Sequence, residues 1–331
     1  MASALSIDVI IPARDATRTI GACLRALRQE GVPSAVHHLI VVDDGSRDDT
    51  ARIAEEHGAT VLHSGGRGPA AARNVGLRAS TTQVIAFLDA DTEPRSGWLQ
   101  ALTRPFADPG IVAVKGRYHS RQRELIARYA QLEFVEKYER LASAPSVDFV
   151  DTGTAAFRRD SLNAIGGFDE SFREPSAEDV DLGYRLQASG GRLAFAPNAG
   201  VWHQHPTSLL AFLHRKARYG RYRAAVYRAF PRKAVSDSYT PRLTRPRILL
   251  AAIVLVLIPV ATIVAEVRAV ALFALFLHGA TTVAIAARTW KSDRPLALAA
   301  PGIALATSVA QVIGLGMGLV DLLRKRGARA P

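Results

Sequence analysis

The stretch Val84-Ile85-Ala86-Phe87-Leu88-Asp89-Ala90-Asp91 joins an apolar run to a pair of acidic side chains. A short apolar run of this kind is typical of a buried strand. Two carboxylates two residues apart at the end of such a strand can share one hard divalent cation through oxygen ligands, and a cation held there can neutralise a diphosphate. We therefore predict a strand over residues 83–88 with a metal site at Asp89 and Asp91; a solvated turn is the alternative.

The sequence around this strand alternates between short β-rich runs and helical patterns. Strands are predicted at 7–12, 38–42 and 60–62, and helices at 17–29, 49–57 and 69–78. This alternation is typical of a parallel sheet covered by helices on both faces. Ligands bind such sheets beyond the carboxyl ends of the strands, where the polar turns of this segment lie.

Two of these turns carry candidate donor-binding groups. Asp43-Asp44-Gly45-Ser46 follows an apolar run, and its carboxylates could accept hydrogen bonds from a base or from ribose hydroxyls. A plain Asx turn is the alternative. The glycine loop at 65–68 leads into a helix that carries Arg73, whose guanidinium could clamp a phosphate.

Two further candidates lie later in the chain. Glu178-Asp179 stands at the start of a predicted helix and could provide a general base for an attacking hydroxyl, although a carboxylate there is often a helix cap. His203 and His205 follow a strand predicted at 192–196, and either imidazole could face a metal. A structural role is the alternative for both histidines.

Taken in order, these motifs resemble family 2 glycosyltransferases with the GT-A fold. The resemblance covers about the first 205 residues and rests on Ile10-Ile11-Pro12, Val42-Asp43-Asp44-Gly45-Ser46, Ala72-Arg73-Asn74-Val75-Gly76, Asp89-Ala90-Asp91, Gly166-Gly167-Phe168-Asp169 and Glu178-Asp179. It implies an inverting transferase that takes a sugar from a nucleoside diphosphate with a divalent metal, Mn or Mg. The implied fold is α/β: a GT-A-type, Rossmann-like mixed sheet, mainly parallel, with helices on both faces, followed by an α-helical membrane region.

The resemblance also assigns roles to individual residues. Asp179 is expected to deprotonate the acceptor hydroxyl, with Glu178 beside it. The expected metal ligands are Asp89, Asp91 and His203. The expected donor-binding residues are Pro12, Ala13, Arg14, Asp43, Asp44, Arg73, Asp89 and Ala90.

Processive members of this family carry a Gln-x-x-Arg-Trp motif downstream of these residues. The comparable place here reads Arg215-Lys216-Ala217-Arg218-Tyr219. Arg218 and Tyr219 are candidate contacts to the acceptor or the diphosphate, standing in for the final pair of the motif. The glutamine is absent, which argues against processive polymerisation.

Charge is concentrated in one part of the chain. The net charge is +12 in total, and in residues 207–247 eleven basic residues are opposed only by Asp237. Nucleic acid is the usual partner of such a cluster. This one adjoins an apolar segment, where basic residues attract anionic lipid, and leucines and aromatic residues lie among its arginines. We therefore predict an amphipathic segment on an anionic membrane surface and no nucleic-acid partner.

Three apolar segments follow, at 248–265, 269–287 and 296–320, the last interrupted by Pro301 and several glycines. Segments of about 20 residues match the ~30 Å hydrocarbon core, and helices in the core of a soluble domain would usually keep a polar stripe. We predict a catalytic domain at 1–206, a basic interfacial segment at 207–247 and a transmembrane region of about three segments at 248–331. The single cysteine excludes a disulfide scaffold.

Flanking charges suggest an orientation. Basic residues before the first segment and after the second place both flanks on the cytoplasmic side. A third span would export Arg324-Lys325-Arg326, against that tendency, so this segment is re-entrant, packed between helices, or an exception. No basic stretch followed by an apolar one opens the sequence, so the catalytic domain is expected in the cytoplasm, at the inner (plasma) membrane.

The leading hypothesis is a membrane-anchored glycosyltransferase that uses a nucleoside-diphosphate sugar and a lipid-linked or cell-envelope glycan acceptor. A nucleotidyltransferase is the alternative enzyme, but it would typically place a glycine-rich loop after the first strand, where this chain reads Pro12-Ala13-Arg14-Asp15. An inactive membrane scaffold with the same fold is the non-enzymatic alternative, and the acidic residues at 89, 91 and 179 argue against it.

Overall fold

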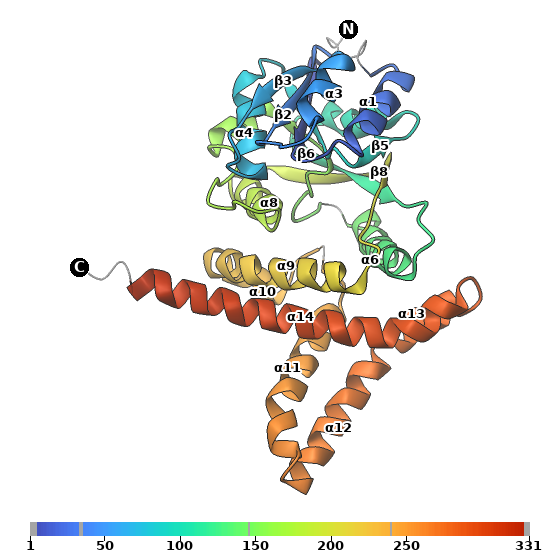
Figure 1. The fold of residues 1–331 in the computed structure, drawn as a ribbon. Coiled ribbons are helices and arrows are strands. Elements are labelled where there is room, and N and C mark those ends of the chain that lie inside the picture. Colours follow the sequence, from blue (N-terminus) through green and yellow to red (C-terminus); the bar gives the residue numbers. More distant parts are fainter. Residues whose placement is uncertain (1–4, 33–35, 145, 239, 328–331) are drawn as a thin grey trace. The chain divides into compact units, whose positions relative to one another are not determined.

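The computed structural model describes residues 5–32, 36–144, 146–238 and 240–327, and the chain divides into two compact units (Figure 1). The first unit comprises residues 1–121 and 138–204, and the second comprises 122–137 and 205–331. The predicted division at 206 and 247 remains a prediction. Residues 122–137, which come from the middle of the predicted catalytic domain, pack with the C-terminal helices in the second unit.

An eight-stranded mixed sheet forms the centre of the first unit, with the order β3-β2-β1-β4-β7-β6-β8-β5. The strands are β1 (Ile7–Ala13), β2 (His38–Asp43), β3 (Thr60–His63), β4 (Val84–Leu88), β5 (Thr92–Pro94), β6 (Ile111–His119), β7 (Thr154–Arg158) and β8 (Arg192–His203). The first four strands in this order are parallel, and β7 is antiparallel to both of its neighbours. The predicted α/β class with a mixed, mainly parallel sheet is confirmed.

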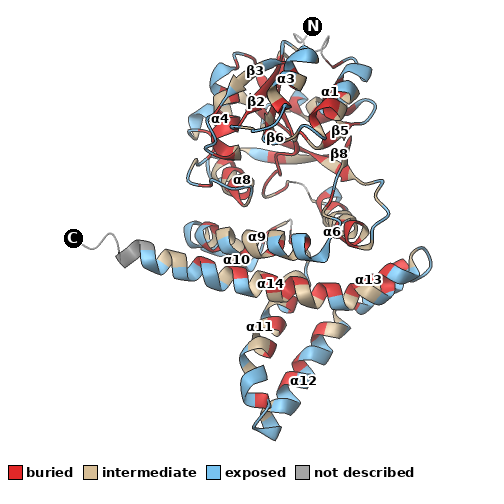
Figure 2. Ribbon diagram, in the orientation of Figure 1, coloured by how far each residue is buried: buried red, intermediate tan, exposed pale blue. Residues whose placement is uncertain are grey.

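The helices of this unit are α1 (Ile20–Gln29), α3 (Thr50–Glu56), α4 (Pro69–Ala79), α5 (Trp98–Thr103), α7 (Arg159–Ala164) and α8 (Glu178–Ala188), with a 3-10 turn at Arg104–Ala107. α4 packs on β1 and β2. Gly76 permits this close approach, because a Cβ there would lie 2.5 Å from Ile10. Figure 2 shows the buried residues gathered in the strands and in the helix faces that cover them. The sheet is therefore a rigid platform for the groups at its carboxyl edge.

Helices alone build the described part of the second unit. They are α6 (Leu125–Ala142), whose residues up to 137 belong here, α9 (Leu209–Ala229), α10 (Pro231–Val235), α11 (Thr244–Ala261), α12 (Ala265–Ala280), α13 (Val283–Trp290) and α14 (Arg294–Gly327). α11 and α12 form a hairpin, and α14 lies beside α9 (Figure 1). The core of this unit joins α6, α9, α13 and α14 through residues such as Tyr129, Phe212 and Ile285.

Three helical segments are long and apolar enough to cross a membrane: Thr244–Ala261, Ala265–Trp290 and Arg294–Arg324. The second and third contain the segments predicted at 269–287 and 296–320, whereas the first ends at Ala261, before the predicted end at 265. Pro301 and the glycines do not interrupt the third, because α14 runs as one helix through all of them. Two of these glycines serve packing: a Cβ at Gly314 or Gly318 would clash with the backbone of α9 at Ala217 or Arg221.

Candidate active site

Arg73 joins two of the acidic motifs that the sequence singled out. Its guanidinium is buried on α4, with Nη2 3.1 Å from Oδ1 of Asp89 and Nη1 3.1 Å from Oε1 of Glu178. Two carboxylates offset the cost of burying this cation. A single side chain thus connects the carboxyl end of β4 to the first turn of α8. The prediction that Arg73 clamps a phosphate remains a prediction; in this structure the guanidinium joins Asp89 and Glu178.

Asp91 and His203 also lie near Asp89. His203 ends β8, and its Nε2 is 3.9 Å from Oδ2 of Asp91. Desolvation, together with the negative charge of Asp91, raises the pKa of Asp89, although Arg73 and His203 act in the opposite direction. Two adjacent carboxylates and an imidazole form a donor set that suits Mn²⁺ or Mg²⁺.

Gly153 leaves room for this arrangement. A Cβ at this position would lie 2.5 Å from Oδ2 of Asp89, and the backbone oxygen of Gly153 accepts a 3.1 Å hydrogen bond from the backbone nitrogen of Asp89. The carboxylates of Asp89 and Asp91 are both partly exposed. The described residues of this site therefore fit a divalent cation in the donor chemistry of their side chains and in their accessibility.

Asp179 lies in the first turn of α8, beside Glu178. Desolvation and the charges of Glu178 and Asp151 raise its pKa to about 8, while Arg73 and the backbone N–H of Val180 oppose this rise. The predicted alternative, a helix cap, does not hold for Glu178, because its Oε2 accepts a 2.8 Å hydrogen bond from the nitrogen of Ser176, which precedes α8 and is no part of the helix. Asp179 is left as a half-buried carboxyl with raised proton affinity, as a general base requires.

Asp151 was missed by the sequence analysis. It is buried and pairs with Lys115, a fully buried lysine on β6. The charge of Asp151 is one of the causes of the raised pKa of Asp179. A lysine inside the apolar run that begins at Ile111 was the available signal, because a buried lysine needs an anionic partner.

A second group of polar residues occupies the ends of β1 and β2, where the register pairs Ala13 with Asp43. Asp44 is buried and accepts hydrogen bonds from Oγ of Ser64 at 2.5 Å and from the nitrogen of Gly68 at 2.9 Å. Arg14 approaches Asp44 to 3.7 Å.

Asp43 accepts a 3.2 Å hydrogen bond from the nitrogen of Ser46, as in the turn offered as its alternative. Gly68 has a φ of +101°, and a Cβ there would collide with the carbonyl of Arg173. This position of the loop therefore requires glycine. Pro12, Ala13, Arg14, Asp43 and Asp44 lie at neighbouring strand ends, where a nucleoside was expected.

Comparison with known proteins identifies the family that the sequence of the first unit matches. Residues 8–166 match Glycosyl transferase family 2. These residues form a family 2 glycosyltransferase domain. The pre-mycofactocin glycosyltransferase of Mycobacterium tuberculosis is 37% identical over 227 residues, which are 65% of this chain and 46% of that protein. "Probable glycosyltransferase YdaM" of Bacillus subtilis is 26% identical over 237 residues, 65% of this chain and 54% of that protein. The chain thus spans about half the length of these curated relatives.

The family 2 domain also has a structural counterpart. The mannosyltransferase PcManGT from Pyrobaculum calidifontis, solved in complex with GDP-Man and Mn2+, superimposes with a TM-score of 0.60 at 19% identity. The match covers 97% of this chain and 88% of that one. At this identity the likeness shows the fold, and it confirms the predicted GT-A-like architecture.

The remaining predicted residues belong to the second unit. Arg218 and Tyr219 are on α9 in the second unit, where Tyr219 lines a hollow. His205 is buried there, 2.8 Å from Oε1 of Gln131 and stacked on Phe134. His205 therefore follows the structural alternative.

One further cluster in the family 2 domain has metal-binding spacing. The ligand atoms of Asp8, His37 and His38 lie within 4.8 Å of one another. Asp8 is fully buried, and both of its carboxylate oxygens have partners within the sheet. Oδ2 accepts a 2.6 Å hydrogen bond from Oγ of Ser80, and Oδ1 lies 3.0 Å from Nδ1 of His38. These residues stand at the amino ends of β1 and β2, the edge opposite to the acidic site. The cluster therefore belongs to the sheet framework.

Proposed function

We propose that this chain is a membrane-anchored, inverting, metal-dependent glycosyltransferase. It transfers a sugar from a nucleoside-diphosphate sugar to a hydroxyl of a lipid-linked or cell-envelope glycan acceptor. The observation that carries the proposal is the bridge of Arg73 between Asp89 and Glu178, within a family 2 domain. Through it, three motifs that are distant in the sequence meet at one edge of the sheet.

Asp179 is the proposed general base. Inversion requires the acceptor oxygen to attack the anomeric carbon opposite the departing diphosphate, with a base positioned to take the proton. A pKa of about 8 suits this role, because such a carboxylate binds a proton far better than an exposed one and still ionises near neutral pH. Glu178 positions Arg73 and raises the proton affinity of its neighbour.

Asp89, Asp91 and His203 are the proposed ligands of Mn²⁺ or Mg²⁺. When bound, the cation would neutralise charge on the diphosphate as it leaves. PcManGT, which shares the fold, was solved with GDP-Man and Mn2+, in keeping with this assignment. Pro12, Ala13, Arg14, Asp43, Asp44 and Ala90 are the proposed contacts to the nucleoside and the donor sugar.

The second unit is the proposed membrane anchor at the cytoplasmic face of the inner (plasma) membrane. The basic residues of α9 and of the segment before α11 favour an anionic lipid surface. The hairpin of α11 and α12 would enter the bilayer, and α14 would stay beside α9 at the interface. Arg218 and Tyr219 are proposed contacts to the acceptor or its phosphate.

Incubation of membranes that contain the full chain with radiolabelled UDP-, GDP- and TDP-sugars and Mn²⁺ or Mg²⁺ tests the proposal. We expect metal-dependent transfer of the sugar into lipid or glycan and a rate loss of ~10²–10⁴ in Asp179→Asn. Asp160→Asn is the control, because the Asp160 side chain is 94% exposed on α7.

Three outcomes would contradict the proposal. Near-full turnover in a folded Asp179→Asn protein would remove the assigned base. Release of pyrophosphate with transfer of a nucleotidyl group would indicate the nucleotidyltransferase alternative. Absence of turnover with every donor, together with absence of donor binding, would indicate an inactive scaffold.

A further inference from the structure

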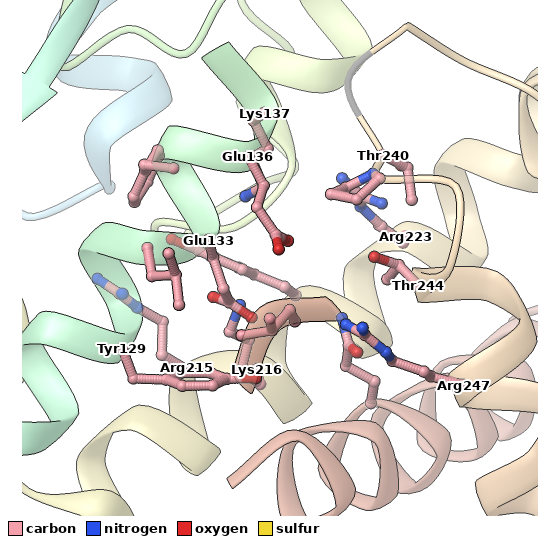
Figure 3. Close-up of a pocket in the computed structure, with 16 residues that line it drawn as sticks. Tyr129, Glu133, Glu136, Lys137, Arg215, Lys216, Arg223, Thr240, Thr244 and Arg247 are labelled. Carbon is pink, nitrogen blue, oxygen red and sulfur yellow. The ribbon is translucent and has the colours of Figure 1, made fainter. Parts of the chain in front are cut away.

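The second unit contains a polar hollow that none of the roles above explains. It has a volume of about 100 Å³ and lies among α6, α9, the start of α11 and the neighbouring segment at 240–244 (Figure 3). A single water needs only roughly 10–15 Å³ of such volume, so the hollow has room for a polyatomic group.

Positive charge is in excess around this hollow. Five basic and two acidic residues line it, namely Lys137, Arg215, Lys216, Arg223 and Arg247 against Glu133 and Glu136. Glu133 is neutralised by Lys216, whose Nζ lies 2.5 Å from its Oε2. The hollow is therefore cationic even with this ion pair formed.

The pKa directions agree with this charge balance. Burial lowers the pKa of Lys216, and the nearby charges of Arg215 and Arg223 lower it further, against the attraction of Glu133. The pKa of Glu133 is lowered by Lys216, Lys137 and Arg215 although burial opposes the shift. The lowered pKa of Glu133 indicates a positive potential, which would attract an anion, whereas burial is the main cause of the lowered pKa of Lys216.

Two arginines are placed to bind such an anion. Figure 3 shows Arg223, Thr244 and Arg247 on one side of the hollow, across from Glu133 and Glu136. Arg247 is held in place by Thr281, with Nε 2.9 Å from Oγ1 and Nη2 2.6 Å from the carbonyl oxygen. Arg223 is oriented by a 3.1 Å hydrogen bond from its Nη1 to the hydroxyl of Tyr227. Oriented guanidinium groups suit the oxygens of a phosphate, which arginine can bind in two-pronged fashion.

The position of the hollow indicates what kind of molecule would carry the anion. Thr244 and Arg247 form the first turn of α11, a helix apolar enough to cross a membrane. Apolar and aromatic side chains, among them Tyr129 and Ile285, line another part of the wall, beside uncharged polar ones such as Gln311. A cationic wall beside an apolar one at the start of a membrane-spanning helix matches a phosphate attached to a hydrocarbon tail.

We propose that this hollow binds the phosphate-bearing head group of a membrane amphiphile, with Arg223 and Arg247 as its phosphate ligands. The inference rests on the membrane placement proposed above. It adds a binding site that is built entirely from residues of the second unit. It also gives Tyr219, which lines the hollow, a place beside that head group.

The test uses the full chain in nonionic detergent and follows its apparent melting temperature. Phosphatidic acid is added as the phosphate-bearing lipid, diacylglycerol with the same tails as the neutral lipid, and inorganic phosphate as the free anion. A ligand that binds the folded state raises the melting temperature. We expect saturable stabilisation by phosphatidic acid and much weaker effects of diacylglycerol and inorganic phosphate.

Two variants on α9 make the test specific. Arg223→Gln should raise the half-saturating concentration of phosphatidic acid by about tenfold or more, because it removes a charged hydrogen bond to phosphate. Arg228→Gln removes the same charge from an exposed position of the same helix and should leave the concentration unchanged. Lys137→Gln, from α6, provides a second variant of the lining if Arg223→Gln does not fold.

Equal losses of affinity for phosphatidic acid in Arg223→Gln and Arg228→Gln would show that surface charge alone causes the binding, and would overturn the proposal. Equal stabilisation by inorganic phosphate or by diacylglycerol would overturn it as well. Stabilisation by UDP- or GDP-sugars with Mn²⁺ is measured on the same proteins. If the donor stabilises and phosphatidic acid does not, the hollow proposal fails alone; if only phosphatidic acid stabilises, the glycosyltransferase proposal fails and the hollow stands.

Discussion

The proton affinity of Asp179 is set by its neighbours more than by its own chemistry. Burial raises the pKa of this carboxyl most, the negative charges of Glu178 and Asp151 raise it further, and Arg73 opposes the rise. Glu178 is on the same helix as Asp179, Arg73 is on α4, and Asp151 lies in the segment before β7, so distant parts of the chain together set the pKa of this carboxyl. A change in one neighbour should therefore move the pH at which Asp179 ionises.

Replacement of Glu178 provides this change. A general base acts when deprotonated, so kcat/KM of the wild type should rise with pH to a plateau above about 8. Glu178→Gln removes a repulsive charge and leaves more of the positive charge of Arg73 uncompensated. Both effects lower the pKa of Asp179, so the rising limb should shift to lower pH.

The measurement is the pH dependence of sugar transfer at limiting acceptor concentration. Glu174→Gln is the control, since Glu174 is exposed in the loop that precedes α8. An unchanged limb in Glu178→Gln would show that another group governs the profile.

The same carboxyl makes stability depend on pH. Its pKa in the folded protein, about 8, exceeds the ordinary value of 3.8, so between these values the folded state holds a proton that the unfolded state releases. Stability therefore falls as pH rises through this window. Asp179→Asn abolishes this loss and should raise the apparent melting temperature of the donor-free protein at pH 9 by about 2–4 °C, with little change at pH 5.

Thermal unfolding at the two pH values, without metal or donor, measures this difference. An equal shift at both would indicate a packing effect in place of a charge effect. A loss of activity combined with a gain in stability at high pH is the pattern expected of a group kept for catalysis.

At the scale of elements, the sequence predicted β1 to β4 and the start of β8, and it left out β5, β6 and β7. The apolar runs of β1, β2 and β4 are local signals, and their ends bring Asp43, Asp44 and Asp89 to one edge. β7 was not predicted, because its place between β4 and β6 depends on antiparallel pairing with strands distant in the sequence. β8 also extends to His203, beyond the predicted end at 196.

The candidate site, like the sheet, could be predicted only in part. The acidic motifs after apolar runs could be predicted from the local sequence, whereas the side-chain contacts that join them could not. Arg73 contacts Glu178 across 105 positions of sequence, and Lys115 contacts Asp151 through the arrangement of β6. Such pairs follow from tertiary packing, for which a single sequence carries little signal.

The glycines of α14 give a prediction at this scale. A Cβ at Gly314 or Gly318 would collide with the backbone of α9, whereas Gly316 has open space around its Cβ position. Gly314→Ala and Gly318→Ala should each destabilise the protein by roughly 1–3 kcal/mol through overpacking. Gly316→Ala should be neutral or stabilise α14 by up to ~1 kcal/mol, because alanine favours a helix.

The stability of the three variants is compared by thermal melting in detergent, followed by circular dichroism of the helices and by loss of the folded protein's peak in size-exclusion chromatography. Equal stability of Gly314→Ala and Gly316→Ala would contradict close contact between α9 and α14.

At the scale of the whole molecule, the packing of α14 on α9 bears on how the chain meets a membrane. α9 carries many basic residues and is unsuited to a bilayer core, while α11 and α12 form a hairpin with exposed apolar side chains such as Val256 and Phe276. A helix packed along α9 would stay at the interface with it. The tail Arg324-Lys325-Arg326 would then remain on the same side as Arg242, Arg245 and Arg247, which satisfies the positive-inside tendency.

This arrangement predicts two membrane crossings, with both ends of the chain on the cytoplasmic side. Epitope tags fused at residue 1 and after residue 331 should both be cut by protease in inverted membrane vesicles and be protected in spheroplasts. A tag inserted at 262–264, between α11 and α12, should show the opposite pattern, and it serves as the internal control. Opposite accessibility of the two terminal tags would mean that α14 crosses the bilayer. To do so, α14 would have to separate from the basic helix α9, against which Gly314 and Gly318 pack.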